Sequence, residues 1–181
     1  MRLPAHRWAK SGSCPGSPAS GRCYLAAVPQ GERRVLLVSS SGGVLLDLLA
    51  LRPWWSRHDV SWVAVPAPDT REVLAGERVT WAAELKPHQP FSAARAVLSA
   101  RAQLRRERID LVVSAGTGIA VPYFLAARLT GVTAWWVETL NVLAGAGIAA
   151  RVCARVGNLV VVQHSALLAD HPRALFVGEL Y

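Results

Sequence analysis

The chain has 181 residues, of which 52% are hydrophobic, and its formal net charge at pH 7 is +8. This length and apolar content fit one domain with a hydrophobic core and exclude a disordered chain. No apolar window reaches the roughly 18 residues of a membrane-spanning helix. The cations have no base-stacking aromatic residues among them, so no nucleic-acid partner is expected. Cys14, Cys23 and Cys153 lack metal-ligand spacing, which favours reduced structural thiols in a cytosolic chain.

The N-terminal segment differs in composition from the rest of the sequence. Residues 1–34 hold six Lys or Arg and one acidic residue, which places +5 of the net charge there. This segment is rich in Pro, Gly and Ser and contains no continuous apolar stretch, so a signal peptide is a poor fit. We therefore expect residues 1–33 to be a disordered basic leader and residues 34–181 to be one folded domain.

From residue 34 onward, short apolar runs typical of buried strands alternate with stretches of helical periodicity. We expect strands at 34–39, 59–65, 78–84, 110–116, 132–138 and 158–163. Helices are expected at 44–51, 91–108 and 119–131 and within 140–155, with loops at 66–70 and 85–90. Apolar strands separated by helices indicate crossover connections and a parallel sheet covered on both faces. The expected fold class is a doubly wound, Rossmann-like α/β domain with about six strands.

Two glycine-rich hinges follow strands of this sheet. The first is SSSGG at 39–43, and the second is SAGTG at 114–118. Ligands of parallel sheets bind outside the carboxyl ends of the strands, where glycine lets the backbone approach them and the next helix N-terminus attracts anions. Both hinges are therefore candidate diphosphate sites, and each is also compatible with an ordinary strand–helix turn. The motifs of nucleoside-triphosphate loops, dinucleotide sites and hydrolase elbows are absent from the sequence.

Few residues are candidates for acid–base chemistry. Glu138 ends the strand expected at 132–138, where active sites of such sheets form, and it is equally compatible with stabilising the N-terminus of the next helix. Asp47, one turn after the first hinge, is as compatible with a surface position. His164 and His171 flank a short helix, where structural roles are more common. Four tryptophans are expected in the core or at an interface: Trp54, Trp55, Trp135 and Trp136.

The helix expected at 91–108 carries an excess of arginine. Its cations are accompanied by a single acid, Glu107, and they are Arg95, Arg101, Arg105, Arg106 and Arg108. One interpretation is a solvated helix face. The other is attraction to anionic lipid head groups or diphosphates.

Four segments, in this order and spacing, resemble a known family. They are VSSSGGVLLDLLAL, DLVVSAGTGIAVPYFLAARLTG, WWVETLN, and the stretch that begins LVVVQHSAL and ends PRALFVGELY. They resemble the asparagine-linked glycosylation protein fourteen family, whose bacterial relatives are glycosyltransferase subunits of polysaccharide biosynthesis. The resemblance runs from about Arg34 to Tyr181. It implies the N-terminal half of a GT-B glycosyltransferase whose C-terminal half is a separate small protein.

The resemblance also implies which parts of the reaction belong to this chain. The partner would hold most of the UDP-sugar, while this chain would supply the acceptor side for a polyprenyl-diphosphate-linked sugar and attach to the membrane. No cofactor or metal is implied, because a helix N-terminus and hydroxyl donors can stabilise the departing UDP. Glu138 would be the catalytic residue. The residues implied at the acceptor or its diphosphate are Ser40, Ser41, Gly42, Gly43, Ser114, Gly116, Thr117 and Gly118. Those implied at the partner interface, where the chain stops and a two-domain enzyme would continue, are Val177, Gly178, Glu179, Leu180 and Tyr181.

Two features depart from the family pattern. Val44 stands where the family often has a histidine that is a candidate base, which moves the chemistry to Glu138 or to the partner. The N-terminal membrane helix of the eukaryotic members is absent, so we expect peripheral attachment to the cytoplasmic face of the cell membrane, through apolar helix surface and the arginine-rich helix.

The expected activity is transfer from a UDP-sugar, of the UDP-N-acetylglucosamine type, to a lipid-linked or polysaccharide acceptor in a bacterial envelope. Two other functions stay open. One is a non-catalytic scaffold that recruits the partner to the membrane. The other is a small nucleotide-cofactor oxidoreductase or sugar-nucleotide-modifying enzyme.

Overall fold

The computed structural model describes residues 31–83, 90–138, 147–163, 165–168, 171 and 174–176. The chain divides into two units, Met1–Gly31 and Glu32–Tyr181. Every described helix and strand belongs to the second unit.

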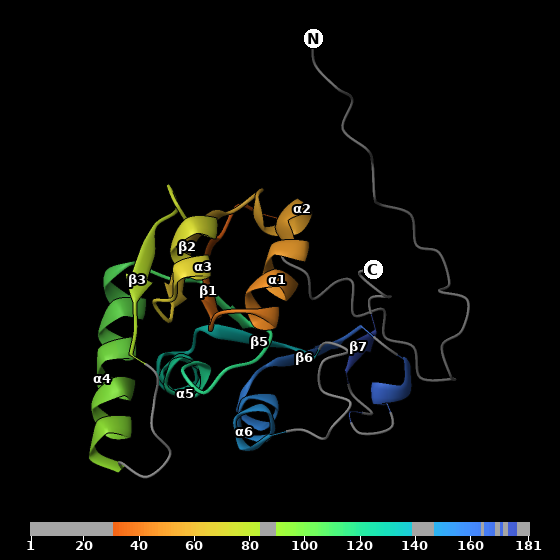
Figure 1. Ribbon diagram of the computed structural model, residues 1–181. Helices are drawn as coiled ribbons and strands as arrows, with labels where there is room; N and C mark the ends of the chain where they lie inside the picture. Colours follow the sequence, from red (N-terminus) through yellow and green to blue (C-terminus); the bar gives the residue numbers. More distant parts are fainter. Residues whose placement is uncertain are drawn as a thin grey trace. The chain divides into compact units, whose positions relative to one another are not determined.

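A parallel sheet forms the centre of this unit (Figure 1). Its strands are β1 (Arg34–Ser39), β2 (Asp59–Ala64), β3 (Val79–Trp81), β4 (Leu111–Ser114), β5 (Thr133–Glu138), β6 (Leu159–Val162) and β7 (Leu175–Phe176). The helices are α1 (Gly43–Ala50), α2 (Arg52–Trp55), α3 (Pro68–Val73), α4 (Pro90–Arg106), α5 (Ala120–Thr130) and α6 (Ile148–Val156), with a 3-10 turn η3 (Ser165–Leu168). The expected Rossmann-like α/β fold is confirmed, with β7 as a further strand.

The order of the strands places a switch point between β1 and β4. The sheet runs β3-β2-β1-β4-β5-β6-β7, and all its pairs are parallel. The chain therefore builds outward from β1 to β3 and then crosses back to β4 on the other side of β1. Because the connections leave β1 and β4 in opposite directions, a crevice forms outside the carboxyl ends of these two strands.

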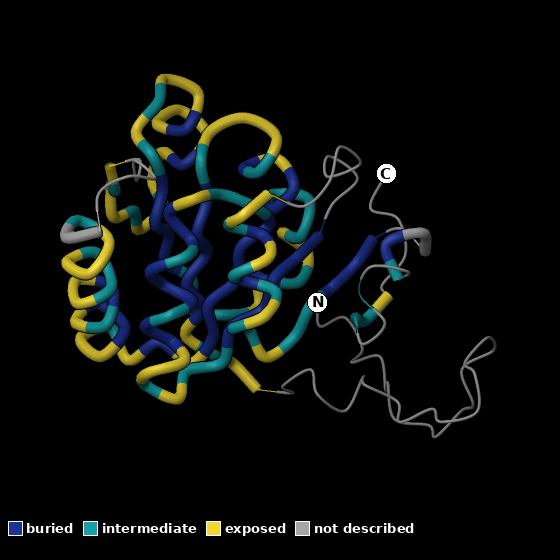
Figure 2. Tube along the Cα trace, turned by 90° about the horizontal axis from the view of Figure 1, so that it is seen from below, coloured by how far each residue is buried: buried dark blue, intermediate teal, exposed yellow. Residues whose placement is uncertain are grey.

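Helices cover both faces of the sheet. On one face, Leu36 of β1 and Val112 of β4 belong to the same buried cluster as Leu104 of α4, Phe124 of α5 and Cys153 of α6. In Figure 1 α5 and α6 lie below the sheet and α4 lies to its left, whereas α1 and α2 lie at the upper right. The central strands β1, β4 and β5 are almost entirely buried, as the dark blue segments of Figure 2 show, whereas the edge strands β3 and β7 contain no buried residue. Alternate residues of the apolar strands thus pack against opposite helical layers.

Of the four tryptophans expected in the core or at an interface, Trp55, Trp135 and Trp136 are buried and Trp54 is half-buried. Trp55 of α2 packs edge-on against Trp62 of β2, and its indole N–H donates to the carbonyl oxygen of Leu48 at 2.8 Å. Trp54 stacks on Trp135 with ring centroids 5.7 Å apart. These contacts fix α1 and α2 against the sheet directly after the first hinge.

Two local expectations were wrong. The segment 66–70 was expected to be a loop, but α3 begins within it at Pro68. Proline suits this position because the first helical residue has no intrahelical partner for an N–H. The surface position considered for Asp47 is also excluded, because this residue is 2% exposed within α1.

Cys153 lies in the core at the end of α6. It is fully buried, and burial raises the pKa of its thiol to about 12. A thiol in this state stays protonated and inert at neutral pH, as expected of a structural cysteine. Cys14 and Cys23 lie outside the described residues.

Candidate functional site

The two glycine hinges lie next to each other at the switch point. β1 pairs with β4 so that Val38 is opposite Ser114, and one hinge follows each strand. The two hinges are in close contact, since a Cβ atom added to Gly116 would lie 3.2 Å from Cγ2 of Val44. The structure therefore brings the segments 39–43 and 114–118 together at the carboxyl edge of the sheet.

The second hinge has an unusual backbone. Gly116 has a φ of 140°, and Thr117, a β-branched residue, has a φ of 137°. Such a conformation costs about 1–3 kcal/mol in a residue other than glycine. Ser114 anchors the hinge from below: its buried hydroxyl donates to the carbonyl oxygen of Val38 at 2.8 Å. Ser114 is fully buried, so Gly116, Thr117 and Gly118 form the accessible part of this hinge.

The first hinge begins helix α1 and meets an acidic residue that sequence reasoning missed. Gly42 has a φ of 72°, and its carbonyl oxygen accepts from the N–H groups of Leu45 and Leu46 at 3.1 and 3.2 Å. Its own N–H donates to Oδ2 of Asp69, at the start of α3, at 3.2 Å. Ser41, Gly42 and Gly43 are exposed. The Asp69 carboxylate thus already accepts a hydrogen bond from one of the backbone N–H groups that a diphosphate would use.

This contact predicts that Asp69→Asn strengthens diphosphate binding. An asparagine keeps a hydrogen-bond acceptor for Gly42 but removes a negative charge from the N-terminus of α1. Charges at an exposed helix N-terminus contribute about 0.3–1 kcal/mol, so the Kd of inorganic pyrophosphate should fall about 2- to 5-fold. Isothermal calorimetry measures this change. Asp110→Asn is the matched control, because Asp110 binds the backbone N–H of Arg34 at the amino edge of the sheet. An unchanged or weaker affinity in Asp69→Asn would count against anion binding at the first hinge.

Glu138 lies at the carboxyl end of β5, beside the second hinge, and contacts His171. β4 pairs with β5, with Ser114 opposite Trp136. The carboxylate of Glu138 is 1% exposed, and its Oε2 atom lies 2.9 Å from Nε2 of His171, whose side chain is 21% exposed. This is an ion-pair distance, but within the described part of the chain neither carboxylate oxygen has a partner in hydrogen-bond geometry. The histidine therefore separates a buried carboxylate from solvent.

Gln163 is a second buried polar residue at this edge of the sheet. It follows β6, and its backbone N–H donates to the carbonyl oxygen of Glu138 at 3.3 Å. Gln163 is 1% exposed, and both polar atoms of its amide lack a hydrogen-bond partner among the described residues. Each such atom costs about 1–3 kcal/mol when it stays unsatisfied. Buried polar groups without a protein partner call for a water, an ion or a ligand group as their partner.

A groove next to this cluster is open to solvent. It runs along α6, has a volume of about 590 Å³ and includes His171 in its wall. Arg151 and Arg155 line it together with the apolar side chains Ile148 and Val152. Two guanidinium groups beside an apolar surface suit an amphipathic anion.

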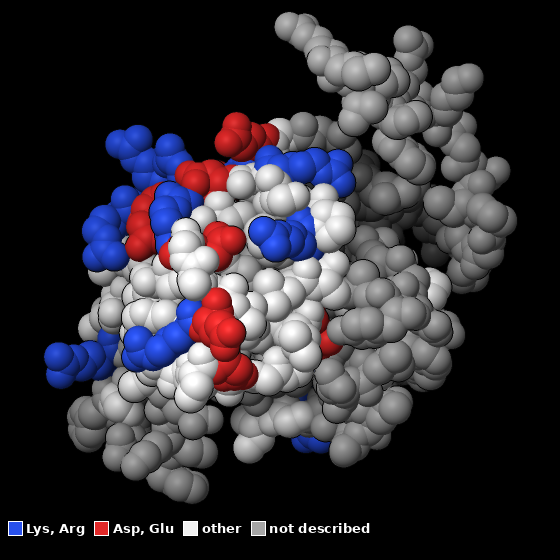
Figure 3. Space-filling model, turned by 45° about the horizontal axis from the view of Figure 1, so that its top comes forward, with Lys and Arg blue, Asp and Glu red and all other residues white. Residues whose placement is uncertain are grey.

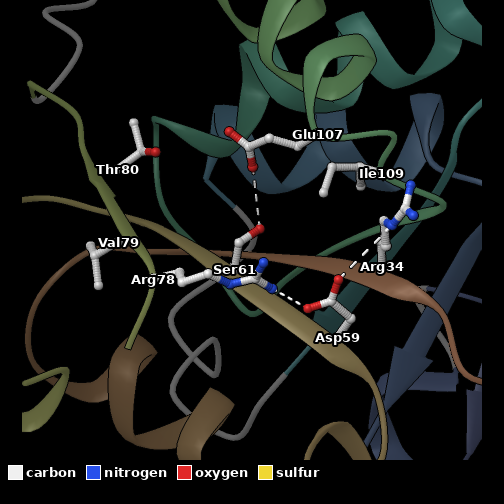
Figure 4. A pocket seen from close by; sticks show the side chains of 8 residues that line it. All are labelled: Arg34, Asp59, Ser61, Arg78, Val79, Thr80, Glu107 and Ile109. Atoms are coloured by element: carbon white, nitrogen blue, oxygen red, sulfur yellow. Dashed lines mark hydrogen bonds and ion pairs between the residues drawn. The ribbon is translucent and has the colours of Figure 1, made fainter. Parts of the chain in front are cut away.

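A second cavity, of about 420 Å³, lies at the opposite edge of the sheet (Figure 4). Arg34, Asp59 and Val79 line it from the amino ends of β1, β2 and β3. Its charges are largely paired: Asp59 forms ion pairs with Arg34 and Arg78, and Ser61 donates to a carboxylate oxygen of Glu107 at 3.4 Å. No residue predicted for the site lines this cavity, and in parallel sheets ligands bind at the carboxyl edge instead.

The arginine-rich helix α4 packs on α5 and leaves one face exposed. Tyr123 of α5 donates to the buried amide oxygen of Gln103 at 2.7 Å. On the outer face, Arg95, Leu98 and Arg105 follow helical spacing, and Leu98 is 64% exposed. By contrast, Figure 3 shows a face of the molecule on which Arg side chains lie interspersed with Asp and Glu.

Several predictions fall outside what the structure describes. The expected partner interface, Val177–Tyr181, lies there, and so does His164. In the ranges that are described, no group of three or more His, Cys, Asp or Glu side chains could hold a metal ion. None of the described helices combines the length and apolar character needed to cross a membrane.

The sequence carried little signal for Asp69 and Gln163, and it pointed to His171 without its contact to Glu138. Asp69 reaches Gly42 from a helix that the sequence did not predict. His171 contacts Glu138 across the edge of the sheet, from a segment much later in the chain. The signal for Gln163 was weak, namely a polar residue directly after an apolar strand.

Comparisons with known proteins find relatives by structure alone. No protein-family model matches the sequence, and no curated protein matches it. MurG from Acinetobacter baumannii aligns with a TM-score of 0.61 and 23% identity, over 74% of this chain and 41% of that one. A glycosyltransferase from Rickettsia africae aligns with a TM-score of 0.63 and 14% identity, over 81% of this chain and 43% of that one. The UDP-GlcNAc 2-epimerase from Neisseria meningitidis, in a structure bound to UDP-GlcNAc, aligns with a TM-score of 0.60 and 13% identity, over 81% of this chain and 47% of that one.

These similarities show the fold. The chain has the Rossmann-like architecture of one half of GT-B proteins, and it spans less than half the length of each of the three.

Proposed function

We propose that this chain is the acceptor-side half of a split, inverting UDP-sugar glycosyltransferase. The observation that carries the proposal is the pair of glycine hinges side by side at the switch point of the sheet. Exposed glycines and the N-terminus of α1 suit a diphosphate, which UDP-sugars and polyprenyl-linked acceptors both contain.

A separate subunit would bind the donor. Three similarities support this part of the proposal: the motifs of the asparagine-linked glycosylation protein fourteen family, the GT-B half-fold, and neighbours whose names refer to UDP-GlcNAc. The donor in this proposal is a UDP-sugar of the UDP-N-acetylglucosamine type, bound largely by the partner.

The acceptor would be a sugar on a lipid carrier or a growing polysaccharide. The outer face of α4 supports peripheral attachment to an anionic membrane, because an exposed leucine lies on it with two arginines. Basic side chains near such a surface each contribute about 1 kcal/mol, and salt screens this attraction. The C-terminal segment 177–181 would contact the partner.

The experiment is affinity purification of the tagged chain from membranes of its native host, before and after a high-salt wash. Mass spectrometry should find a small Rossmann-type protein in stoichiometric yield, and salt should release the complex from the membrane. The purified pair should then transfer radiolabelled sugar from UDP-N-acetylglucosamine to a polyprenyl-diphosphate-linked acceptor.

Two substitutions test the site within this assay. Gly116→Ala should strongly reduce transfer, because a φ of 140° is strained for alanine and the added Cβ atom would lie 3.2 Å from Cγ2 of Val44. Gly147→Ala is the control, since a Cβ atom there has no neighbour within 4 Å. Recovery of the chain without a partner contradicts the split enzyme. Full activity of the partner alone on a soluble acceptor would instead make this chain a recruiting scaffold.

A further inference from the structure

We infer that His171 is the group that accepts the proton from the attacking acceptor hydroxyl, and that Glu138 positions the imidazole ring. This inference rests on the proposed function and deepens it by assigning the base. It also revises the role expected for Glu138 from catalytic residue to positioning residue.

Burial separates the roles of the two residues. Glu138 is 1% exposed, so a sugar hydroxyl has no access to its carboxylate in this conformation. The side chain of His171 is 21% exposed and forms part of the wall of the α6 groove. Of the two, the histidine is therefore the one that a substrate can contact.

The contact between the two residues selects a nitrogen. Nε2 of His171 faces Oε2 of Glu138 at 2.9 Å. A carboxylate at this distance favours the tautomer with the proton on Nε2, which leaves the lone pair on Nδ1. The N–H does not yet point along the line to the carboxylate oxygen. Catalytic hydrogen bonds are often poorly aligned before substrate binds, and a small rotation of the ring would align this one.

The carboxylate of Glu138 is poorly satisfied for a buried group. A buried carboxylate normally has hydrogen bonds to backbone or side-chain donors, and among the described residues Glu138 has none. Its position at the carboxyl end of β5, next to the second hinge, is where substrates bind in such sheets. Val44, directly after the first hinge, supplies no base of its own. The Glu138–His171 pair provides a base at the same edge of the sheet.

The chemical step can be written in full. The acceptor hydroxyl oxygen forms a bond to the anomeric carbon of the UDP-sugar, and its proton moves to Nδ1 of His171. The bond between the anomeric carbon and the diphosphate oxygen breaks, and UDP leaves with the electron pair. Among the described residues, His171 contacts the charged group of Glu138 of β5, and it shares the lining of the α6 groove with Arg151 and Arg155.

The first test uses the chain alone and does not require activity. Long-range proton–nitrogen spectra of the ¹⁵N-labelled full chain report which imidazole nitrogen of His171 carries the proton. We expect Nε2–H with an unprotonated Nδ1 in the neutral ring, and a loss of this preference in Glu138→Gln. A neutral ring with the proton on Nδ1 would overturn the inference.

The second test uses the reconstituted pair. His171→Gln should lower kcat by about 100- to 10,000-fold with little change in KM, the range that general-base catalysis supplies. The acidic limb of the pH–kcat profile should flatten, and added imidazole should restore part of the activity of His171→Ala. Glu138→Gln should show a smaller loss in kcat. His58→Gln, in a histidine that packs against Trp54, is the control.

The outcomes separate the two proposals. Transfer by the wild-type pair together with wild-type kcat in His171→Gln overturns the inference and leaves the proposed function intact. An inactive wild-type pair contradicts the proposed function. The nitrogen spectra of the chain alone would still test whether Glu138 holds the proton of His171 on Nε2.

Discussion

Trp136→Ala is expected to lower the free energy of unfolding by about 3–5 kcal/mol, the usual cost of removing a buried tryptophan. Trp136 is 2% exposed in the middle of β5 and packs edge-on against Phe124 of α5, with ring centroids 5.8 Å apart. The truncation would leave a cavity between the sheet and α5. Trp136 lies two residues before Glu138 on the same strand, so the loss of its side chain should also make the position of Glu138 less well fixed. Urea denaturation followed by circular dichroism measures the effect.

Two further variants separate burial from other causes. Trp81→Ala removes a tryptophan that is 40% exposed and that contacts Arg71 at 5.0 Å from the ring centroid, so its cost should stay near or below about 1 kcal/mol. Trp136→Phe keeps an aromatic ring and removes an indole N–H that has no partner among the described residues. Its cost should therefore lie well below that of Trp136→Ala. Equal losses in Trp136→Ala and Trp81→Ala would show that the α5 face of the sheet is not the main core.

The fold was predictable because its signal is local. An apolar run such as 34–39 or 133–138 indicates a buried strand by itself, and helices between such runs require parallel crossovers. The short helices α2 and α3 were not predicted, since four to six residues show too little periodicity. Strand β7 was not predicted either, because its two residues are too few to show an alternating pattern. Their positions depend on packing against the sheet.

The candidate site was predictable only in part, for a related reason. Glycine hinges after apolar strands are visible in the sequence, and the parallel topology brings 39–43 and 114–118 to one edge. The contacts of Gly42 with Asp69 and of Glu138 with His171 join segments far apart in the chain. Hydrophobic periodicity carries no information about such polar contacts. Whether a carboxylate is exposed or covered by an imidazole changes its chemistry, and the sequence is the same in both cases.

Gly157→Ala is expected to destabilise the domain by about 1–3 kcal/mol through overpacking. Gly157 ends α6 with a φ of −65°, which any residue can adopt, so backbone strain is not the reason. A Cβ atom there would lie 2.9 Å from the carbonyl oxygen of Cys153, 3.2 Å from Cε1 of Phe124 and 3.3 Å from the carbonyl oxygen of Ala134. Two of these three atoms belong to the backbone and cannot rotate away.

Hydrogen bonds hold this junction on both sides. The N–H of Gly157 donates to Cys153 at 2.7 Å, and Asn158 both donates to and accepts from the backbone of Ala134, each at 2.8 Å. An added methyl group must therefore move the end of α6 away from β5, and β6 begins directly afterwards. Because β6 leads to Gln163 beside Glu138, transfer by the reconstituted pair should fall together with stability. Gly147→Ala lies at the N-cap of α6 in open space, so it should lower stability by at most about 1 kcal/mol, the cost of alanine at an N-cap, and leave transfer nearly unchanged. Thermal and urea denaturation compare the stabilities of the two variants. Equal stability would mean that the connection between α6 and β6 adjusts to the added methyl group and does not fix the position of β6.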